Sequence, residues 1–143
     1  MPLYVERKIG VVSGIDISEE MIALARKKVP RRKPSDVIID LSVGDAQKTK
    51  FNDRGVDVAV CVRFLDLIDE DAMRAVLIEL ARVTKRAIIL TIRLGDAYLP
   101  KSNTAEHDRK KFNALVKRLG FAVTGTERFR EGSWHILKLE RRK

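Results

Sequence analysis

The chain has 143 residues, of which 45% are hydrophobic, and this size suits one domain with a proper core. No apolar run approaches the roughly 18 residues of a membrane span, and charges from Glu6 onward argue against a signal peptide. The net charge of +9 permits attraction to nucleic acid, anionic lipid or a phosphorylated small molecule. A lone cysteine, Cys61, cannot form an internal disulfide, which predicts a cytoplasmic protein.

Much of the excess positive charge lies in two runs, 27–33 and 141–143, and in the segment 109–118. Two interpretations stay open, because such runs form either solvated faces or a dedicated anion site. The run 27–33 contains no aromatic residue on which bases could stack. A nucleic-acid partner is therefore possible but not indicated.

Residues 11–25 predict a strand, a tight acidic turn and a helix. The strand signal is a short apolar run rich in β-branched residues, and Ser18 stands where a helix N-cap is expected. The helix should end near Val29, because Pro30 cannot continue it. Asp16 then lies at the carboxyl end of a strand, where open α/β sheets place ligand contacts, and it can accept hydrogen bonds from both hydroxyls of a ribose.

The rest of the chain alternates between strand and helix patterns, while the role of 1–10 is ambiguous. We expect strands over 37–43, 56–62 and 87–92, helices from Asp69 and over 104–119, and a final hairpin of strands 121–129 and 133–139 about Glu131-Gly132. The run 58–62 should be buried on both faces in the middle of a sheet, and 93–103 should be a long loop. This order favours an α/β domain with a largely parallel sheet and an antiparallel pair at one edge.

Four features stand in a characteristic order along the chain. They are the segment Gly14-Ile15-Asp16-Ile17-Ser18-Glu19-Glu20-Met21, then Gly44-Asp45-Ala46, the strand 58–62, and Gly120-Phe121 before a hairpin. Together they resemble class I S-adenosylmethionine-dependent methyltransferases over nearly the whole chain. The resemblance implies a single methyltransferase-like domain over 1–143, built as a Rossmann-like three-layer sandwich with a mostly parallel sheet and a C-terminal antiparallel hairpin. It also implies S-adenosylmethionine as the cofactor.

The resemblance further implies a cofactor site and an acceptor pocket. The implied cofactor-binding residues are Asp16, Ile17, Met21, Asp45, Ala46, Val62 and Arg63, and the implied borders of the acceptor pocket are Phe64 and Leu65. In this scheme Asp16 binds the ribose and Asp45 accepts from the adenine amino group. Taken singly, each feature has another interpretation, since Asp16 can be a helix cap, Asp45 a turn residue and Met21 part of the core.

The chain departs from the family at its N-terminal end. The family's first strand, its Gly-rich turn and most of the next helix should precede Val11, and no Gly-x-Gly motif occurs anywhere. The resemblance is thus to a member truncated at the N-terminus. The missing strand is central in the family, between 11–17 and 56–62, so its loss exposes two strand edges. Either those strands pair directly or another chain fills the gap, and we therefore predict a homodimer or higher homo-oligomer.

Methyl transfer depends mainly on alignment of the acceptor with the methyl group, and it needs a general base only for a protonated acceptor. The candidate bases are His107, His135, Asp66, Asp69 and Tyr98. His107 either swings over a cofactor from the long loop or is a surface histidine near a helix start, and His135 is better explained by packing. We assign no catalytic residue, and no metal site is predicted, because one cysteine and two distant histidines give no ligand set.

Arg63 ends a strand that we expect to be buried, where a charge is costly unless it meets a partner. One interpretation places it in a cleft, where it holds a carboxylate of the cofactor or an anionic acceptor. The other is a salt bridge with Asp66 or Asp69. Both stay open.

Three functions are compatible with these features. The first is a methyltransferase that acts on an unknown acceptor, which Asp16 and Asp45 favour. The second is a catalytically silent relative, a binding or scaffolding domain with a basic surface, which the absent Gly-rich turn favours. The third is a fragment whose missing part is supplied elsewhere.

Overall fold

The computed structural model of the chain describes residues 10–30, 37–100, 104–128 and 133–143. The expectations for 1–9 and for the hairpin turn Glu131-Gly132 lie outside the described residues. The chain divides into two compact units, with unit 1 ending at Thr49 and unit 2 beginning at Lys50. The single domain over 1–143 stays a prediction.

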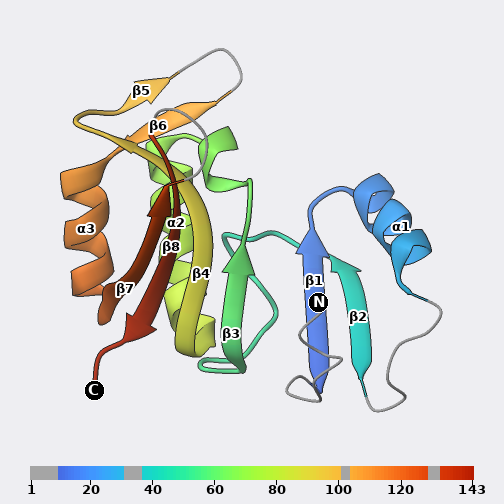
Figure 1. Cartoon of the computed structure of the whole chain (residues 1–143). Coiled ribbons are helices and arrows are strands. Elements are labelled where there is room, and N and C mark those ends of the chain that lie inside the picture. The colour runs from blue at the N-terminus through green and yellow to red at the C-terminus, as the bar shows by residue number, and fades with distance from the viewer. Residues whose placement is uncertain (1–9, 31–36, 101–103, 129–132) are drawn as a thin grey trace. The chain divides into compact units, whose positions relative to one another are not determined.

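The described residues of unit 1 form two parallel strands and one helix (Figure 1). These elements are β1 (Val11–Asp16), α1 (Glu19–Lys28) and β2 (Ile38–Val43). Ser18 caps α1 as predicted, because its Oγ accepts a hydrogen bond from the Met21 N–H at 3.2 Å. Asp16 at the end of β1 pairs in register with Val43 at the end of β2, so both strands end at the same edge.

Unit 2 is a mixed sheet with two long helices (Figure 1). Its elements are β3 (Val56–Cys61), the short 3-10 helix η2 (Leu65–Leu67), α2 (Glu70–Val83), β4 (Thr84–Gly95), β5 (Leu99–Pro100), β6 (Ala105–Asp108), α3 (Arg109–Arg118), β7 (Phe121–Arg128) and β8 (Trp134–Arg141). The strand order is β5-β6-β4-β8-β7, and β3 pairs with β4. The β3–β4 pair is parallel, whereas β4–β8 and β7–β8 are antiparallel, which confirms the predicted terminal hairpin strands.

The core of unit 2 forms where the helices cover the sheet. Val76 and Leu77 of α2, Leu90 of β4, Phe112 of α3 and Phe121 of β7 are all buried. These side chains recur at helical spacing on the helices and within the apolar strands, as the sequence pattern predicts. In the described part of the chain, none of the helices combines the length and the apolar character of a membrane crossing.

The prediction of one helix over 104–119 was wrong at its start. Residues Ala105–Asp108 form β6, which pairs with Leu94 and Gly95 of β4, and α3 begins only at Arg109. The Asp108 carboxylate accepts a hydrogen bond from the Lys111 N–H at 3.0 Å, so this acid is the N-cap. The predicted loop 93–103 likewise contains the end of β4 and the short strand β5. Pairing with distant strands decided these boundaries.

The prediction that 58–62 is buried on both faces was also wrong. Among the described residues, β3 has a single hydrogen-bonded neighbour, β4. Val58 and Val60 are 41% and 64% exposed, while Cys61 at the end of the strand is buried. Within the described part of the chain, the outer edge of β3, the edge away from β4, therefore has no strand neighbour, and β3 exposes apolar side chains.

Candidate functional site

Two carboxylates stand at the shared edge of unit 1. Asp16 ends β1 and Asp45 follows β2, and the Gly44 N–H donates to the Asp16 carbonyl oxygen at 2.9 Å. Each carboxylate uses its Oδ1 to accept a local backbone N–H at 2.8 Å, Asp16 from Ser18 and Asp45 from Gln47. Both side chains are exposed. Each acid is thus fixed by a short turn and remains open to a ligand.

This geometry bears on the alternatives that the sequence left open. Asp16 is not the helix cap, because Ser18 takes that role. Asp45 does form a turn, as the second interpretation held, and its carbonyl oxygen accepts from the Lys48 N–H at 3.1 Å. A turn of this kind positions a carboxylate without using up its second oxygen.

Two apolar side chains that follow Asp16 in sequence stay outside the core. Ile17 and Met21 are 73% and 52% exposed, so Met21 is not part of the core. Ala46, next to Asp45, is half-buried. Exposed apolar groups beside convergent polar groups are typical of small-molecule sites, where they form the walls that a flat ring contacts.

In unit 2 the backbone turns sharply after β3, at Arg63. Its φ of 54° lies in the left-handed region, which is uncommon for a residue with a side chain. The Arg63 N–H donates to the Thr91 Oγ1 at 2.7 Å, and Thr91 is buried in β4. Strained backbone of this type is concentrated at functional sites. Val62, just before Arg63, and Phe64, just after it, are exposed and half-buried respectively.

The next turn is held by a buried histidine. His107 of β6 is fully buried, and its Nε2 donates to the Leu65 carbonyl oxygen at 2.6 Å. Because a carbonyl only accepts, Nε2 is the nitrogen that donates in this bond. Both predicted positions for His107, a mobile loop and the protein surface, were wrong, since β6 places it in the core. Leu65 is also fully buried, which puts its side chain in the core beneath the segment after β3.

The Arg63 guanidinium lies over an aromatic ring of a different strand. Its central carbon is 5.9 Å from the centre of the Trp134 ring, and that of Arg93 is 5.5 Å from the same centre. The described residues contain no ion pair between Arg63 and Asp66 or Asp69. Asp69 instead caps α2 by accepting from the Ala72 N–H at 2.8 Å. The predicted salt bridge between Arg63 and Asp66 or Asp69 is therefore not formed in the described structure.

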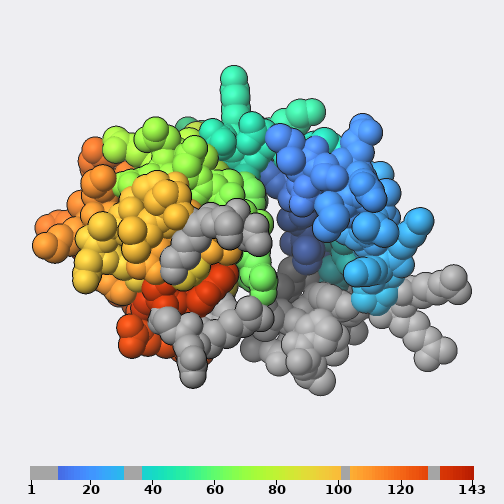
Figure 2. Space-filling view, turned by 90° about the horizontal axis from the view of Figure 1, so that it is seen from above, coloured from blue at the N-terminus to red at the C-terminus, as the bar shows by residue number. Residues whose placement is uncertain are grey.

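Sequence reasoning missed Thr91, Arg93 and Trp134. Thr91 and Arg93 lie two residues apart on β4, and Arg93 pairs in register with Trp134 of β8. The spacing of two was a usable signal, because such residues share one face of a strand. Only the pairing of β4 with β8 adds the tryptophan to this face. Figure 2 shows unit 2 from above, with green and yellow segments, which follow β3 in the chain, at the visible surface.

Cys61 ends β3 directly before this segment. Burial, and secondarily the charge of Asp66, raises the pKa of its thiol from 9.0 to about 11. At about pH 8 the thiolate fraction is then about 100-fold below that of an unperturbed thiol. We expect iodoacetamide to alkylate the folded protein correspondingly slowly and the urea-unfolded protein at the ordinary rate. Equal rates, followed by mass spectrometry, would contradict this burial.

His135 of β8 is buried, and its Nδ1 lies 2.7 Å from the Ser133 carbonyl oxygen. Burial lowers its pKa below the ordinary 6.5. As the pH falls through 6.5, the unfolded chain binds a proton that the folded chain does not, so the free energy of unfolding should fall and then level off below the folded-state pKa. Urea titrations from about pH 7 to 5.5 test this, and His135→Gln should reduce the slope.

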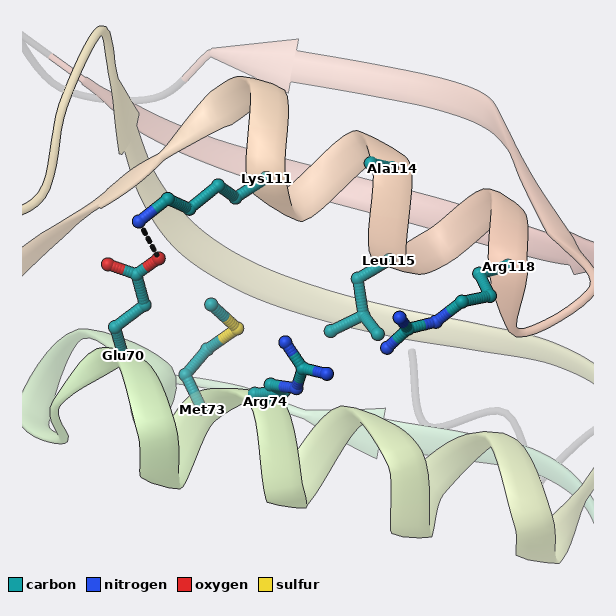
Figure 3. Close-up of a pocket in the computed structure, with 7 residues that line it drawn as sticks. All are labelled: Glu70, Met73, Arg74, Lys111, Ala114, Leu115 and Arg118. Atoms are coloured by element: carbon teal, nitrogen blue, oxygen red, sulfur yellow. Dashed lines mark ion pairs between the residues drawn. The ribbon is translucent and has the colours of Figure 1, made fainter.

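A groove between α2 and α3 is lined mainly by basic and apolar side chains (Figure 3). It has a volume of about 280 Å³ and is lined by Glu70, Met73, Arg74, Lys111, Ala114, Leu115 and Arg118. The Lys111 Nζ lies 3.1 Å from a Glu70 carboxylate oxygen, and the Arg74 and Arg118 guanidinium groups point into the groove (Figure 3). Three of the seven lining residues are basic and one is acidic.

No group of three metal-ligating side chains occurs within residues 10–30, 37–100, 104–128 and 133–143.

Comparison with solved structures shows a common fold. A magnesium protoporphyrin IX methyltransferase from Synechocystis PCC 6803, solved with bound SAM, matches with a TM-score of 0.73 and 22% identity over 92% of this chain and 59% of its own. A protein from Pyrococcus horikoshii OT3 matches with a TM-score of 0.73 and 20% identity, over 99% of this chain and 75% of its own. An S-adenosylmethionine-dependent methyltransferase from Mesorhizobium loti matches with a TM-score of 0.72 and 13% identity, over 96% of this chain and 83% of its own. These likenesses confirm the predicted Rossmann-like α/β fold.

The chain thus spans 59% of the length of the Synechocystis enzyme. No curated protein matches it. A family model described as a methyltransferase domain matches residues 3–87, which is more than half of the 143 residues and includes both carboxylates of unit 1 and the segment after β3. The chain therefore belongs to the methyltransferase domain family.

Proposed function

We propose that this protein is an S-adenosylmethionine-dependent methyltransferase. The observation that carries the proposal is the pair Asp16 and Asp45, fixed by turns at the shared edge of β1 and β2. Each carboxylate keeps an oxygen for a ligand, and Ile17 and Met21 offer exposed apolar surface beside Asp16. These residues fit an adenosine, whose hydroxyl and amino groups donate hydrogen bonds and whose flat ring faces can pack against apolar side chains.

We assign the remaining contacts along the same segments. Asp16 holds the ribose hydroxyls, Asp45 the adenine amino group, and the Ala46 N–H faces the ring. On the family resemblance alone, we assign Val62 and the backbone of Arg63 to the methionine portion. Phe64 borders the acceptor, and Leu65 supports that border from the core, where it is fully buried.

When bound, S-adenosylmethionine supplies an electrophilic methyl group, whose bond to sulfur breaks as the bond to the acceptor forms and a neutral sulfide leaves. The protein must hold the acceptor in line with that bond. His107 and His135 are both buried and engaged with backbone carbonyls, and Asp69 caps a helix. We therefore assign catalysis to alignment and name no general base.

Calorimetric titration with S-adenosylmethionine and S-adenosylhomocysteine tests the proposal. We expect binding, and we expect Asp16→Asn to weaken it about tenfold or more, because a charge-assisted hydrogen bond to the ribose is lost. Asp40→Asn removes an exposed carboxylate from β2 and serves as the matched control. Absence of binding by the folded protein, or equal affinity of the Asp16→Asn variant, would refute the proposed site.

We further propose a homodimer or higher homo-oligomer, in which a second copy covers the outer edge of β3. Two observations support this proposal. Among the described residues β3 pairs only with β4, and Val58 and Val60 of β3 are exposed. Sedimentation should show a species larger than 16.3 kDa, and Val60→Lys should dissociate it. A folded wild-type monomer would contradict the proposal.

A cytoplasmic location is also proposed, supported by the free thiol of Cys61.

A binding or scaffolding role of the basic surface is the second candidate function. The groove between α2 and α3 favours it, because Arg74 and Arg118 point into it and neither forms an ion pair with a described residue. Filter binding of RNA tests one anionic partner, and the double variant Arg74→Gln, Arg118→Gln should reduce retention. Retention that is absent or unchanged would remove this candidate for RNA.

A further inference from the structure

We infer that Arg63, Arg93 and Trp134 form a binding site for an anionic group, a carboxylate or a phosphate, carried by the methyl acceptor. Its role in methyl transfer rests on the proposed function, whereas the anion site itself does not. All three residues belong to unit 2, at the carboxyl end of β3 and at the paired ends of β4 and β8.

Charge is unbalanced at this site. Both guanidinium groups lie within 5.9 Å of the centre of one ring, so they share a small region. Arg93 is neutralised there, since its Nη2 lies 3.6 Å from a Glu106 carboxylate oxygen and its Nη1 donates to Thr104 Oγ1 at 2.6 Å. Arg63 has no carboxylate partner among the described residues. Among the described residues, one carboxylate therefore faces two guanidinium groups, and an anion would balance the net positive charge that remains.

The two arginines also differ in burial, which divides their roles. The Arg93 side chain is 13% exposed and fixed by three neighbours, including Ser133, whose Oγ accepts from Nε at 3.3 Å. Arg63 is exposed. Arg93 therefore holds the Trp134 ring in place and adds positive charge to the site, whereas Arg63 is the group that a ligand can reach.

The backbone at Arg63 is held in a conformation that a side chain disfavours. The left-handed φ of 54° persists because the Arg63 N–H is bonded to the buried Thr91 Oγ1. This geometry fixes where the arginine side chain leaves the chain. A residue kept in a strained conformation by a buried partner is one whose direction matters.

The direction of the Arg63 side chain within unit 2 indicates where an anion would meet it. β4 lies between β3 and β8 in the sheet, and the ring that Arg63 contacts is at the start of β8. The guanidinium therefore extends across β4, away from the outer edge of β3. The Trp134 ring adds a flat apolar surface beside the charge, so the site fits an oxyanion attached to a planar or apolar body.

The single tryptophan of the chain makes the site measurable without an acceptor. We would titrate the 143-residue chain with inorganic phosphate and, separately, acetate at constant ionic strength, using chloride as the reference, and follow Trp134 fluorescence. We expect a saturable change in about the millimolar range for at least one of the two anions. Arg63→Gln should abolish it, while Arg86→Gln, which removes an exposed charge at the other end of β4, should retain it.

Titration of the same variants with S-adenosylhomocysteine completes the test. Under our inference Arg63→Gln leaves that affinity unchanged. A tenfold or greater loss would instead assign Arg63 to the cofactor's carboxylate and overturn the inference. So would the lack of any specific fluorescence response in the wild type, or an equal response in Arg63→Gln. If the wild type binds phosphate or acetate at Trp134 but no S-adenosylhomocysteine, the proposed function fails while the anion site stands.

Discussion

Replacement of Phe112 with alanine is expected to lower the free energy of unfolding by about 3–5 kcal/mol. The phenylalanine is fully buried on the inner face of α3, where the apolar residues of that helix meet the sheet. Truncation removes the transfer free energy of the ring and leaves a cavity that the neighbouring strands cannot fill. Urea unfolding followed by Trp134 fluorescence and by circular dichroism measures the change.

Asn113→Ala provides the matched control for this prediction. It changes the next residue of the same helix, which is exposed, and should alter stability by no more than about 0.5 kcal/mol. If Phe112→Ala cost as little as Asn113→Ala, α3 would not pack on the sheet as described.

Replacement of His107 with leucine is expected to cost about 1–3 kcal/mol, because it leaves the Leu65 carbonyl oxygen buried without a donor. His107→Gln retains an N–H group and should cost less. Unfolding measurements on the two variants separate the lost hydrogen bond from changes in packing.

The same pair of variants tests whether β6 positions the segment after β3. The bond from His107 fixes the start of η2, and the three residues before η2 include Arg63. His107→Leu should therefore also weaken the fluorescence response to phosphate or acetate, and His107→Gln should weaken it less. A stability loss with an unaltered response would show that η2 holds its shape without this bond.

Local patterns predicted the elements whose signals are complete within a few residues. The cap at Ser18 and the acid–turn arrangement of Asp16 and Asp45 could be read directly, because the residues that make these hydrogen bonds are neighbours in sequence. The buried apolar face of α2 could also be predicted from the spacing of its apolar residues. Cofactor contacts of these residues stay predictions.

Elements decided by distant pairing could not be read in this way. Residues Ala105–Asp108 carry a pattern compatible with a helix start, and only β4 makes them a strand. The same pairing moved His107 from an expected surface position into the core. Likewise, the run 58–62 is apolar enough for a central strand, but its burial depends on a second neighbour, which the sequence of the run does not contain.

The left-handed turn at Arg63 bears on how this protein can be engineered. Glycine adopts such a φ at no steric cost, so Arg63→Gly relieves strain at a position where almost any other residue retains it. Libraries screened for thermal tolerance alone would enrich glycine here, and libraries screened for acceptor turnover would enrich arginine. At position 63, selection for thermal stability and selection for turnover would thus favour different residues. Sequences evolved under the two screens should differ there.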